Sequence, residues 1–248
     1  MSPPPSRAAQ VEPFSLPGNW YRGILHVHST RSDGDRSVEE VQAWYRGQGY
    51  HFMALTDHDV LSESRAVADD FVTISGIEVE GIDPAAGLYH LVGLGAETAP
   101  AMQFLEVLPL QAGVDRVATV ARLVVMAHPY WSGQRSADLL PIERCSLLEV
   151  YNGGCDVDDA KGFSAVHWDD LLAAGRRWRA LATDDAHWRN GTKDAGLGWV
   201  WVKAPRLNAE SLLEALEDGR FYASSGPEIH GIEVDGRQVR VRCSPATA

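Results

Sequence analysis

Residues 24–34 read Ile-Leu-His-Val-His-Ser-Thr-Arg-Ser-Asp-Gly, an apolar run that ends in two histidines and is followed by an acidic turn. Alternate side chains of a β-strand point to the same face, so His26 and His28 can face one ion while Val27 points into the core. The turn at Asp33 and Gly34 can return a carboxylate to the same place. Imidazole suits zinc, iron and manganese. One His-x-His pair is weak evidence by itself, so a metal site requires further ligands from the rest of the chain.

The composition is typical of a globular protein with one large core. The chain has 248 residues, of which 45% are hydrophobic and 23% charged. Residues 1–17 are rich in proline and are expected to form a poorly ordered arm, and residues 18–248 are expected to form a single domain. We expect a cytoplasmic protein without a membrane partner, because the sequence lacks a signal-peptide pattern, a long apolar span and a Cys-x-x-Cys pair.

The net charge of −12 argues against a nucleic-acid polymer as a partner, because such binding depends on basic side chains that neutralise phosphates. A small phosphorylated molecule is a different case. Divalent ions held by acidic ligands can attract an anion into an acidic protein. A small-molecule substrate therefore remains compatible with the charge.

Segments with the patterns of strands alternate with segments that have helical patterns. Strands are predicted at residues 21–27, 50–55, 71–80, 89–94, 123–127, 147–151, 178–183 and 197–202, and a β-hairpin at about 229–242 around Asp235 and Gly236. Helices are predicted at residues 37–48, from about 62, within 105–120, at 168–174 and at 208–217. This alternation predicts parallel β-α units, and about seven of them favour a closed barrel.

Polar residues that can carry chemistry follow several of the predicted strands. In β/α barrels such positions converge at one mouth. His28, His58, His128, Asn152 and Asp185 all occupy them. His90 stands near the start of its strand instead, which suggests a β-ribbon or a loop that folds back.

Taken together, these pieces resemble the PHP (polymerase and histidinol phosphatase) superfamily of metallohydrolases. The match spans about residues 21–227. The short motifs that contain the histidines and carboxylates occur in the family's order, at residues 26–34, 56–59, 76–78, 90, 127–129 and 185–187. The resemblance implies a distorted (β/α)7 barrel with two or three divalent ions (Mn, Fe or Zn) at the carboxyl ends of the strands. Residues 127–131, 149–153 and 224–227 are also similar to the branch named for carbaryl-type metallohydrolases (CehA/McbA).

The resemblance also implies a set of metal ligands. The first ion would be held by His26, His28, Glu78 and Asp185. The second would be held by Asp33, His58 and His187, and Glu78 would bridge to a third ion completed by His90 and His128. Among these, Asp185, His187 and Glu78 are the expected catalytic residues.

Several neighbouring residues have alternative interpretations. Asp57 can orient a ligand or cap a loop rather than bind metal, and Asp184 can be a helper or a bystander beside Asp185. Glu80 can be solvated, and His128 is expected to be extended because it precedes a proline. Glu149 can shape the pocket. The candidates for substrate binding at the mouth are Arg31, Arg135, Arg189, Asn152 and Trp131.

The sequence thus predicts a metal-dependent hydrolase in which a hydroxide bridging two ions attacks a phosphorus or carbonyl centre. The family resemblance favours a phosphoesterase that acts on a small phosphate mono- or diester. Hydrolysis of a carbamate or carboxylic ester is the first alternative, which the CehA/McbA similarity would suit. A non-catalytic, metal-stabilised interaction domain is the second alternative.

Overall fold

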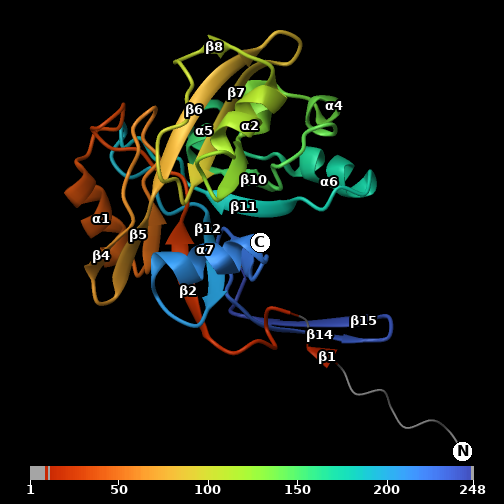
Figure 1. The fold of residues 1–248 in the computed structure, drawn as a ribbon. Helices are drawn as coiled ribbons and strands as arrows, with labels where there is room; N and C mark the ends of the chain where they lie inside the picture. The colour runs from red at the N-terminus through yellow and green to blue at the C-terminus, as the bar shows by residue number, and fades with distance from the viewer. Residues whose placement is uncertain (1–8, 11, 247–248) are drawn as a thin grey trace, which may run out of the picture.

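The computed structural model describes residues 9–10 and 12–246, and two six-stranded sheets form its body (Figure 1). The first sheet contains β6 (Gly76–Asp83), β7 (Gly87–Leu94), β8 (Glu106–Val107), β9 (Leu123–Ala127), β10 (Leu147–Asn152) and β11 (Arg179–Thr183). The second sheet contains β2 (Asn19–Ile24), β3 (Phe52–Ala54), β4 (Arg65–Ala68), β5 (Phe71–Ile74), β12 (Trp199–Ala204) and β13 (Phe221–Ser224).

The closed barrel is not confirmed, because the two sheets stay open. Their strand orders are β11-β10-β9-β7-β6-β8 and β13-β12-β2-β3-β5-β4. Parallel pairing joins β9–β10–β11 in the first sheet and β2–β3–β5 in the second, and the short strand β8 also pairs parallel with β6. The strands β6 and β7 are joined by the short turn at residues 84–86 and pair antiparallel, and β12 pairs antiparallel with β2. A short turn can form only an antiparallel pair, so the regular barrel is interrupted there.

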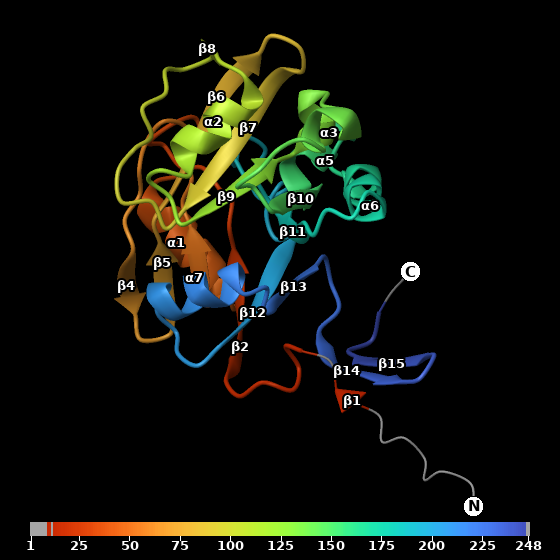
Figure 2. The ribbon, with the colours of Figure 1, turned by 45° about the vertical axis from the view of Figure 1, so that its right-hand side comes forward.

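The two sheets enclose a shared apolar core. Phe52 and Ile74 of the second sheet pack in one cluster with Val92 and Val125 of the first. The helix α7 (Ala209–Glu217) adds Leu212 to the same cluster. Further helices cover the outer faces of the sheets, as the two views in Figures 1 and 2 show. They are α1 (Val38–Gly47) on the second sheet and α2 (Leu110–Val117), α4 (Ser136–Leu139) and α6 (Ala165–Ala173) on the first.

Two isolated bridges connect the sheets at the carboxyl end of the parallel strands. Val27, just after β2, pairs with Ala186, just after β11. His58, after β3, pairs with Glu78 of β6. The polar residues that follow the strands of both sheets are thereby brought to one place.

Most predicted elements are confirmed, including the capping box at Ser37 and the Asn208 cap of α7. The helix predicted from about residue 62 is wrong, because residues 65–68 form β4 and pair with β5. The single strand predicted at 71–80 is also wrong, since the chain leaves the second sheet after Ile74 and enters the first at Gly76. A Cβ on Gly76 would lie 2.9 Å from the Leu55 carbonyl oxygen, so the glycine permits this close crossing.

The predicted terminal hairpin is present as β14 (Ile229–Asp235) and β15 (Gln238–Cys243), which extend away from the body in both views (Figures 1 and 2). The short strand β1 (Ala9–Gln10) pairs with β14. Residues 1–8 and 11 of the predicted arm lie outside the described residues, so the disorder of that arm stays a prediction. Among the described residues, every helix is too short or too polar to cross a bilayer.

Candidate metal centre

The side chains predicted as metal ligands gather around one pocket of about 210 Å³. Seven of the predicted ligands line it, namely Asp33, His58, Glu78, His90, His128, Asp185 and His187. The remaining two, His26 and His28, are buried against Glu78 and Asp185. The antiparallel direction of β7 explains His90, because the start of β7 pairs with the end of β9 and places His90 opposite Ala127. Of the two alternatives for His90, a β-ribbon or a loop that folds back, the structure shows the β-ribbon.

The group predicted for the first ion is tightly packed and fully buried. The Nε2 atoms of His26 and His28 lie 3.0 and 3.1 Å from Oε2 of Glu78, and 3.2 and 3.0 Å from Oδ1 of Asp185. Atoms bound to one ion at about 2.1 Å lie roughly 3.0–3.4 Å from one another. Within the described residues, Glu78 Oε2 and Asp185 Oδ1 have no hydrogen-bond partner. Two buried carboxylate oxygens without donors, facing imidazole nitrogens at these separations, fit a divalent cation.

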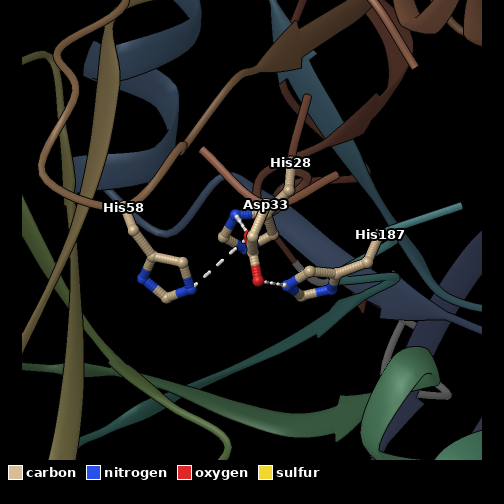
Figure 3. A group of neighbouring side chains, drawn as sticks. All are labelled: His28, Asp33, His58 and His187. Carbon is tan, nitrogen blue, oxygen red and sulfur yellow. Dashed lines mark ion pairs between the residues drawn. The ribbon is translucent and has the colours of Figure 1, made fainter. Parts of the chain in front are cut away.

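A second group contains Asp33, His58 and His187, and His28 joins it through its other ring nitrogen (Figure 3). Asp33 lies between the three rings, with its oxygens 3.3 Å from His187 Nε2, 3.6 Å from His28 Nδ1 and 3.9 Å from His58 Nε2. The Nδ1 atom of His187 lies 2.9 Å from the Asp185 carbonyl oxygen, which accepts a hydrogen bond from the Nδ1–H tautomer. That tautomer leaves Nε2 as a free ligand atom facing Asp33.

Glu78 also faces a third group. Its Oε1 atom lies 2.9 Å from His90 Nδ1 and 3.4 Å from His128 Nε2. The two oxygens of Glu78 thus point to two different sets of imidazoles, as a bridging carboxylate would require. The solvated position suggested for Glu80 is wrong, because this side chain is buried and its Oε2 atom lies 2.8 Å from His58 Nδ1.

Glu149 and Asn152 hold several of the predicted ligands in place. Glu149 Oε1 lies 2.6 Å from His26 Nδ1, so it can accept that proton and leave His26 Nε2 free toward Glu78. Glu149 Oε2 accepts hydrogen bonds from the His128 backbone N–H and from Asn152 Nδ2, each at 2.9 Å. Asn152 Nδ2 also donates to Asp185 Oδ2 at 3.1 Å. Asn152 is fully buried and does not line the pocket, so its geometry suits positioning rather than the predicted contact with substrate.

Two further buried carboxylates lie behind the centre. Asp57 accepts hydrogen bonds from Ser29 N, Ser29 Oγ and Ser32 Oγ at 2.7–2.8 Å, and it therefore fixes the loop that leads to Asp33. Asp184 accepts from Tyr45 Oη and from the backbone N–H groups of residues 196–198 at 2.7–3.0 Å. Burial raises the pKa of Asp184 to about 6, although these hydrogen bonds favour its ionised form. Both carboxylates are fully engaged by the protein itself.

The backbone is left-handed at two of the predicted ligands. Asp185 has φ 54° and His128 has φ 25°. The extended conformation predicted for His128 is therefore wrong. Its N–H is held by Glu149, and its carbonyl accepts from Ser132 N at 3.1 Å in the following turn, so local hydrogen bonds outweigh the preference of a residue before proline. Such strain at two ligands is typical of a functional site.

The carboxylates and imidazoles of the centre shift one another's pKa values. Burial alone would lower the pKa of His58, but Glu78, Glu80 and Asp33 outweigh it and raise the pKa to about 9. Burial would raise the pKa of Glu78 and of Asp185, yet the surrounding histidines, His26 first, hold both well below the ordinary value. These shifts favour protonated imidazoles such as His58 beside ionised carboxylates, so a divalent cation that binds here would compete with those protons.

The predicted substrate-binding residues divide into two sets. Arg189 and Trp131 line the pocket: Arg189 Nη2 lies 2.5 Å from Asp33 Oδ2, and the Trp131 ring lies 5.1 Å from that of His128. The structure does not bring Arg31 and Arg135 to this pocket. Arg31 donates to the Leu61 carbonyl, and Arg135 is largely exposed and pairs with Asp138.

Four pocket-lining residues, Gly154, Cys155, Asp158 and Asp159, are not among those predicted from the sequence. They belong to the short helix α5 (Gly153–Asp159), which the periodicity does not reveal. The importance of Glu149 can be inferred from the sequence. Glu149 is a carboxylate within the apolar strand β10, and a carboxylate in an apolar strand is also the feature that points to Glu78.

Comparison with known proteins supports the assignment of the fold. No family model matches the chain. One curated relative, the phosphoribosyl 1,2-cyclic phosphate 1,2-diphosphodiesterase of Eggerthella lenta, is 38% identical over 88 residues, which cover 33% of this chain. The matched part spans only about a third (34%) of that relative.

Two solved structures are similar over most of the chain. A two-domain protein from Bacteroides vulgatus, which contains a predicted PHP-like metal-dependent phosphoesterase, superposes with a TM-score of 0.60 at 15% identity and covers 92% of this chain and 76% of its own. PsfC from Pseudomonas syringae superposes with a TM-score of 0.56 at 14% identity, covering 84% of this chain and 92% of its own. The resemblance to the PHP superfamily is therefore confirmed for the fold, which this chain shares with PHP-like metal-dependent phosphoesterases, whereas the similarity to the CehA/McbA branch stays a prediction.

Proposed function

We propose that this protein is a metal-dependent phosphoesterase that hydrolyses a small phosphate mono- or diester. The observation that carries the proposal is the arrangement around Glu78, whose two oxygens face separate sets of imidazoles within one pocket. Bound divalent ions would supply an activated water and polarise the phosphorus–oxygen bonds of the substrate. The fold of the PHP-like phosphoesterases and the partial similarity to a phosphodiesterase support the same reaction class.

The residues of the chain have separate tasks in this proposal. Glu78 and Asp185 would supply the negative charge that holds the cations, and the histidines would supply neutral ligands. Hydrogen bonds to Glu149 and to the Asp185 carbonyl fix the ring tautomers of His26 and His187. Glu78, Asp185 and His187 line the pocket and are the proposed catalytic residues. Arg189 stands at the rim, where its guanidinium can bind a phosphate oxygen in exchange for part of its contact with Asp33.

Trp131 lines the pocket beside the rings of His90 and His128. This apolar wall would accommodate the organic part of an ester. It is also the feature that suits the alternative substrate, an aromatic carbamate or carboxylic ester. The hydrolysis of these two classes must therefore be compared directly.

A hydrolysis panel tests the proposal. Protein reconstituted with manganese, iron or zinc is assayed against phosphomonoesters, phosphodiesters, 3′,5′-bisphosphorylated nucleotides, carbamates and aryl esters, with Asp185→Asn as the matched control. We expect turnover of a phosphoester by the wild type and its loss in the variant. Preference for carbamates or carboxylic esters would favour the first alternative, and the absence of any turnover with metals bound would favour a non-catalytic domain.

A further inference from the structure

The thiol of Cys155 is buried and faces the metal pocket. The residue is 7% exposed and lines that pocket. Its sulfur forms a group with a ring nitrogen of His128 and a carboxylate oxygen of Asp185, in which all three donor atoms lie within 4.8 Å of one another. Such a group has the composition of a metal site, because thiolate, imidazole and carboxylate are all ligands of zinc.

The close approach of α5 to the strand end at Asp185 fixes this position. Gly154 N donates to the Asp184 carbonyl at 2.6 Å, and a Cβ on Gly154 would lie 2.8 Å from the Asp185 carbonyl oxygen. Only a glycine permits this approach without displacing the backbone. The N–H of Cys155 then donates to Asn152 Oδ1 at 3.0 Å. Asn152 also holds Asp185, so the thiol and the carboxylate are positioned by the same side chain.

A comparison with Cys145 separates this thiol from an ordinary core cysteine. Cys145 is also buried, but its Sγ donates to the Val124 carbonyl at 3.4 Å within an apolar cluster. The Cys155 sulfur has no such hydrogen bond to any described residue. In the part of the chain that the structure describes, Cys155 is the cysteine that joins a group of candidate ligands.

The orientation of His128 leaves a ring nitrogen for the same site. Its Nδ1 atom lies 3.3 Å from Ser132 Oγ, which can accept the Nδ1 proton. The Nε2 atom then carries the lone pair and faces Asp185 Oδ2 at 3.7 Å and Glu78 Oε1 at 3.4 Å. Because donor atoms of His128, Cys155 and Asp185 lie within 4.8 Å of one another, a cation bound at His128 would have the Cys155 thiol close to it.

We propose that Cys155 is a sulfur ligand of the metal centre, beside His128 and Asp185, and that it makes this side of the pocket selective for thiophilic ions such as Zn²⁺ over Mn²⁺. The inference rests on the metal centre of the proposed function. On binding, the S–H bond of Cys155 breaks, the sulfur coordinates the cation and the proton passes to solvent. A soft thiolate favours zinc or cadmium, whereas sites made of oxygen ligands favour manganese.

Cobalt(II) substitution of the full chain tests the proposal without measuring activity. Wild type loaded with Co²⁺ is expected to show a thiolate-to-cobalt charge-transfer absorption in the near ultraviolet. This absorption should be lost in Cys155→Ser and in Cys155→Ala, and retained in the control Cys145→Ser. In chelator competition, Cys155→Ser should lower the affinity for Zn²⁺ by roughly 10- to 100-fold, as for other determinants of a metal site, and leave that for Mn²⁺ nearly unchanged.

The proposal is overturned if the Cys155 variants keep the absorption, or if wild type binds Co²⁺ without showing it; in either case the metal centre itself survives. Equal loss in Cys145→Ser would also overturn it, because the effect would then belong to general packing. Failure of wild type to bind any Co²⁺ would reject both this inference and the metal centre.

Discussion

The buried carboxylates behind the pocket differ from those that face it in the source of their hydrogen bonds. Asp184 accepts four hydrogen bonds from a tyrosine and three backbone N–H groups, and Asp57 accepts three from the Ser29–Ser32 loop. Asp185 and Glu78 instead each keep one buried oxygen for which the described residues supply no donor. Adjacent aspartates of one loop therefore have opposite tasks: Asp184 holds the loops together, and Asp185 remains available to a cation.

The largest expected effect is a loss of turnover when a carboxylate that faces the pocket is substituted. Asp185→Asn removes a charge that faces two imidazoles, so we expect hydrolysis to fall by on the order of 10³-fold, comparable to losing one preorganised group in a transition state. The melting temperature of the metal-free protein should change little. His58→Ala should lower turnover to a similar extent. Steady-state kinetics and thermal melts on the same samples measure both, and unchanged turnover would remove these residues from the site.

Asp184→Asn should show the reverse pattern. The amide replaces an acceptor oxygen with a donor, so donors among Tyr45 Oη and the N–H groups of residues 196–198 lose their buried partner. We expect the free energy of unfolding to fall by about 3 kcal/mol. Urea denaturation of the metal-free protein checks this, with Asp185→Asn as the control. Equal stability of the two variants would abolish the distinction between the two kinds of carboxylate.

Glu149→Gln tests the link between the ligands and the residues behind them. The substitution keeps the shape of the side chain but removes the negative charge beside His26 Nδ1 and weakens the acceptor for the His128 N–H. The affinity for the first ion is expected to fall by roughly 10- to 100-fold, since carboxylates behind a ligating histidine have effects of this size. Chelator competition measures the affinity, and an unchanged value would show that the ligands are positioned without Glu149.

The smallest expected effect is on pH dependence in the metal-free protein. Because the pKa of His58 is raised from 6.5 to about 9, protonation stabilises the folded state. This stability is fully present below pH 6.5 and is lost as the pH rises through about 9. Metal affinity should rise over the same range, because a cation then no longer competes with the proton. Denaturation curves across this range check the trend, and His58→Gln should flatten it; an identical slope in that variant would contradict the assignment.

The family resemblance, together with positions that follow apolar strands such as those of His58, His128 and Asp185, predicted which side chains gather at the pocket. The sequence also predicted the start of α1 and α7 from single capping residues. The pairing of β12 with β2 and of β7 with β9 was not predictable, because antiparallel contacts between distant segments leave no local pattern. The open sheets follow from these pairings.

The sequence also did not predict the direction in which several side chains point. Arg31 and Arg135 stand in loops near ligand segments, yet one contacts Leu61 and the other Asp138. A solvated Glu80 is compatible with the sequence, but the crossing at Gly76 carries β6 into the interior beside His58. Side-chain direction in loops and at sheet crossings depends on tertiary contacts, which periodicity does not contain.

Metal analysis of the purified protein after reconstitution tests most directly whether the side chains around Glu78 form a multinuclear centre. Wild type and Asp185→Asn are dialysed with manganese, iron or zinc, freed of excess ion and measured for metal per chain. The geometry around Glu78 predicts at least two divalent ions per chain in the wild type and fewer in the variant. A wild-type value clearly below two with every metal would contradict the multinuclear centre.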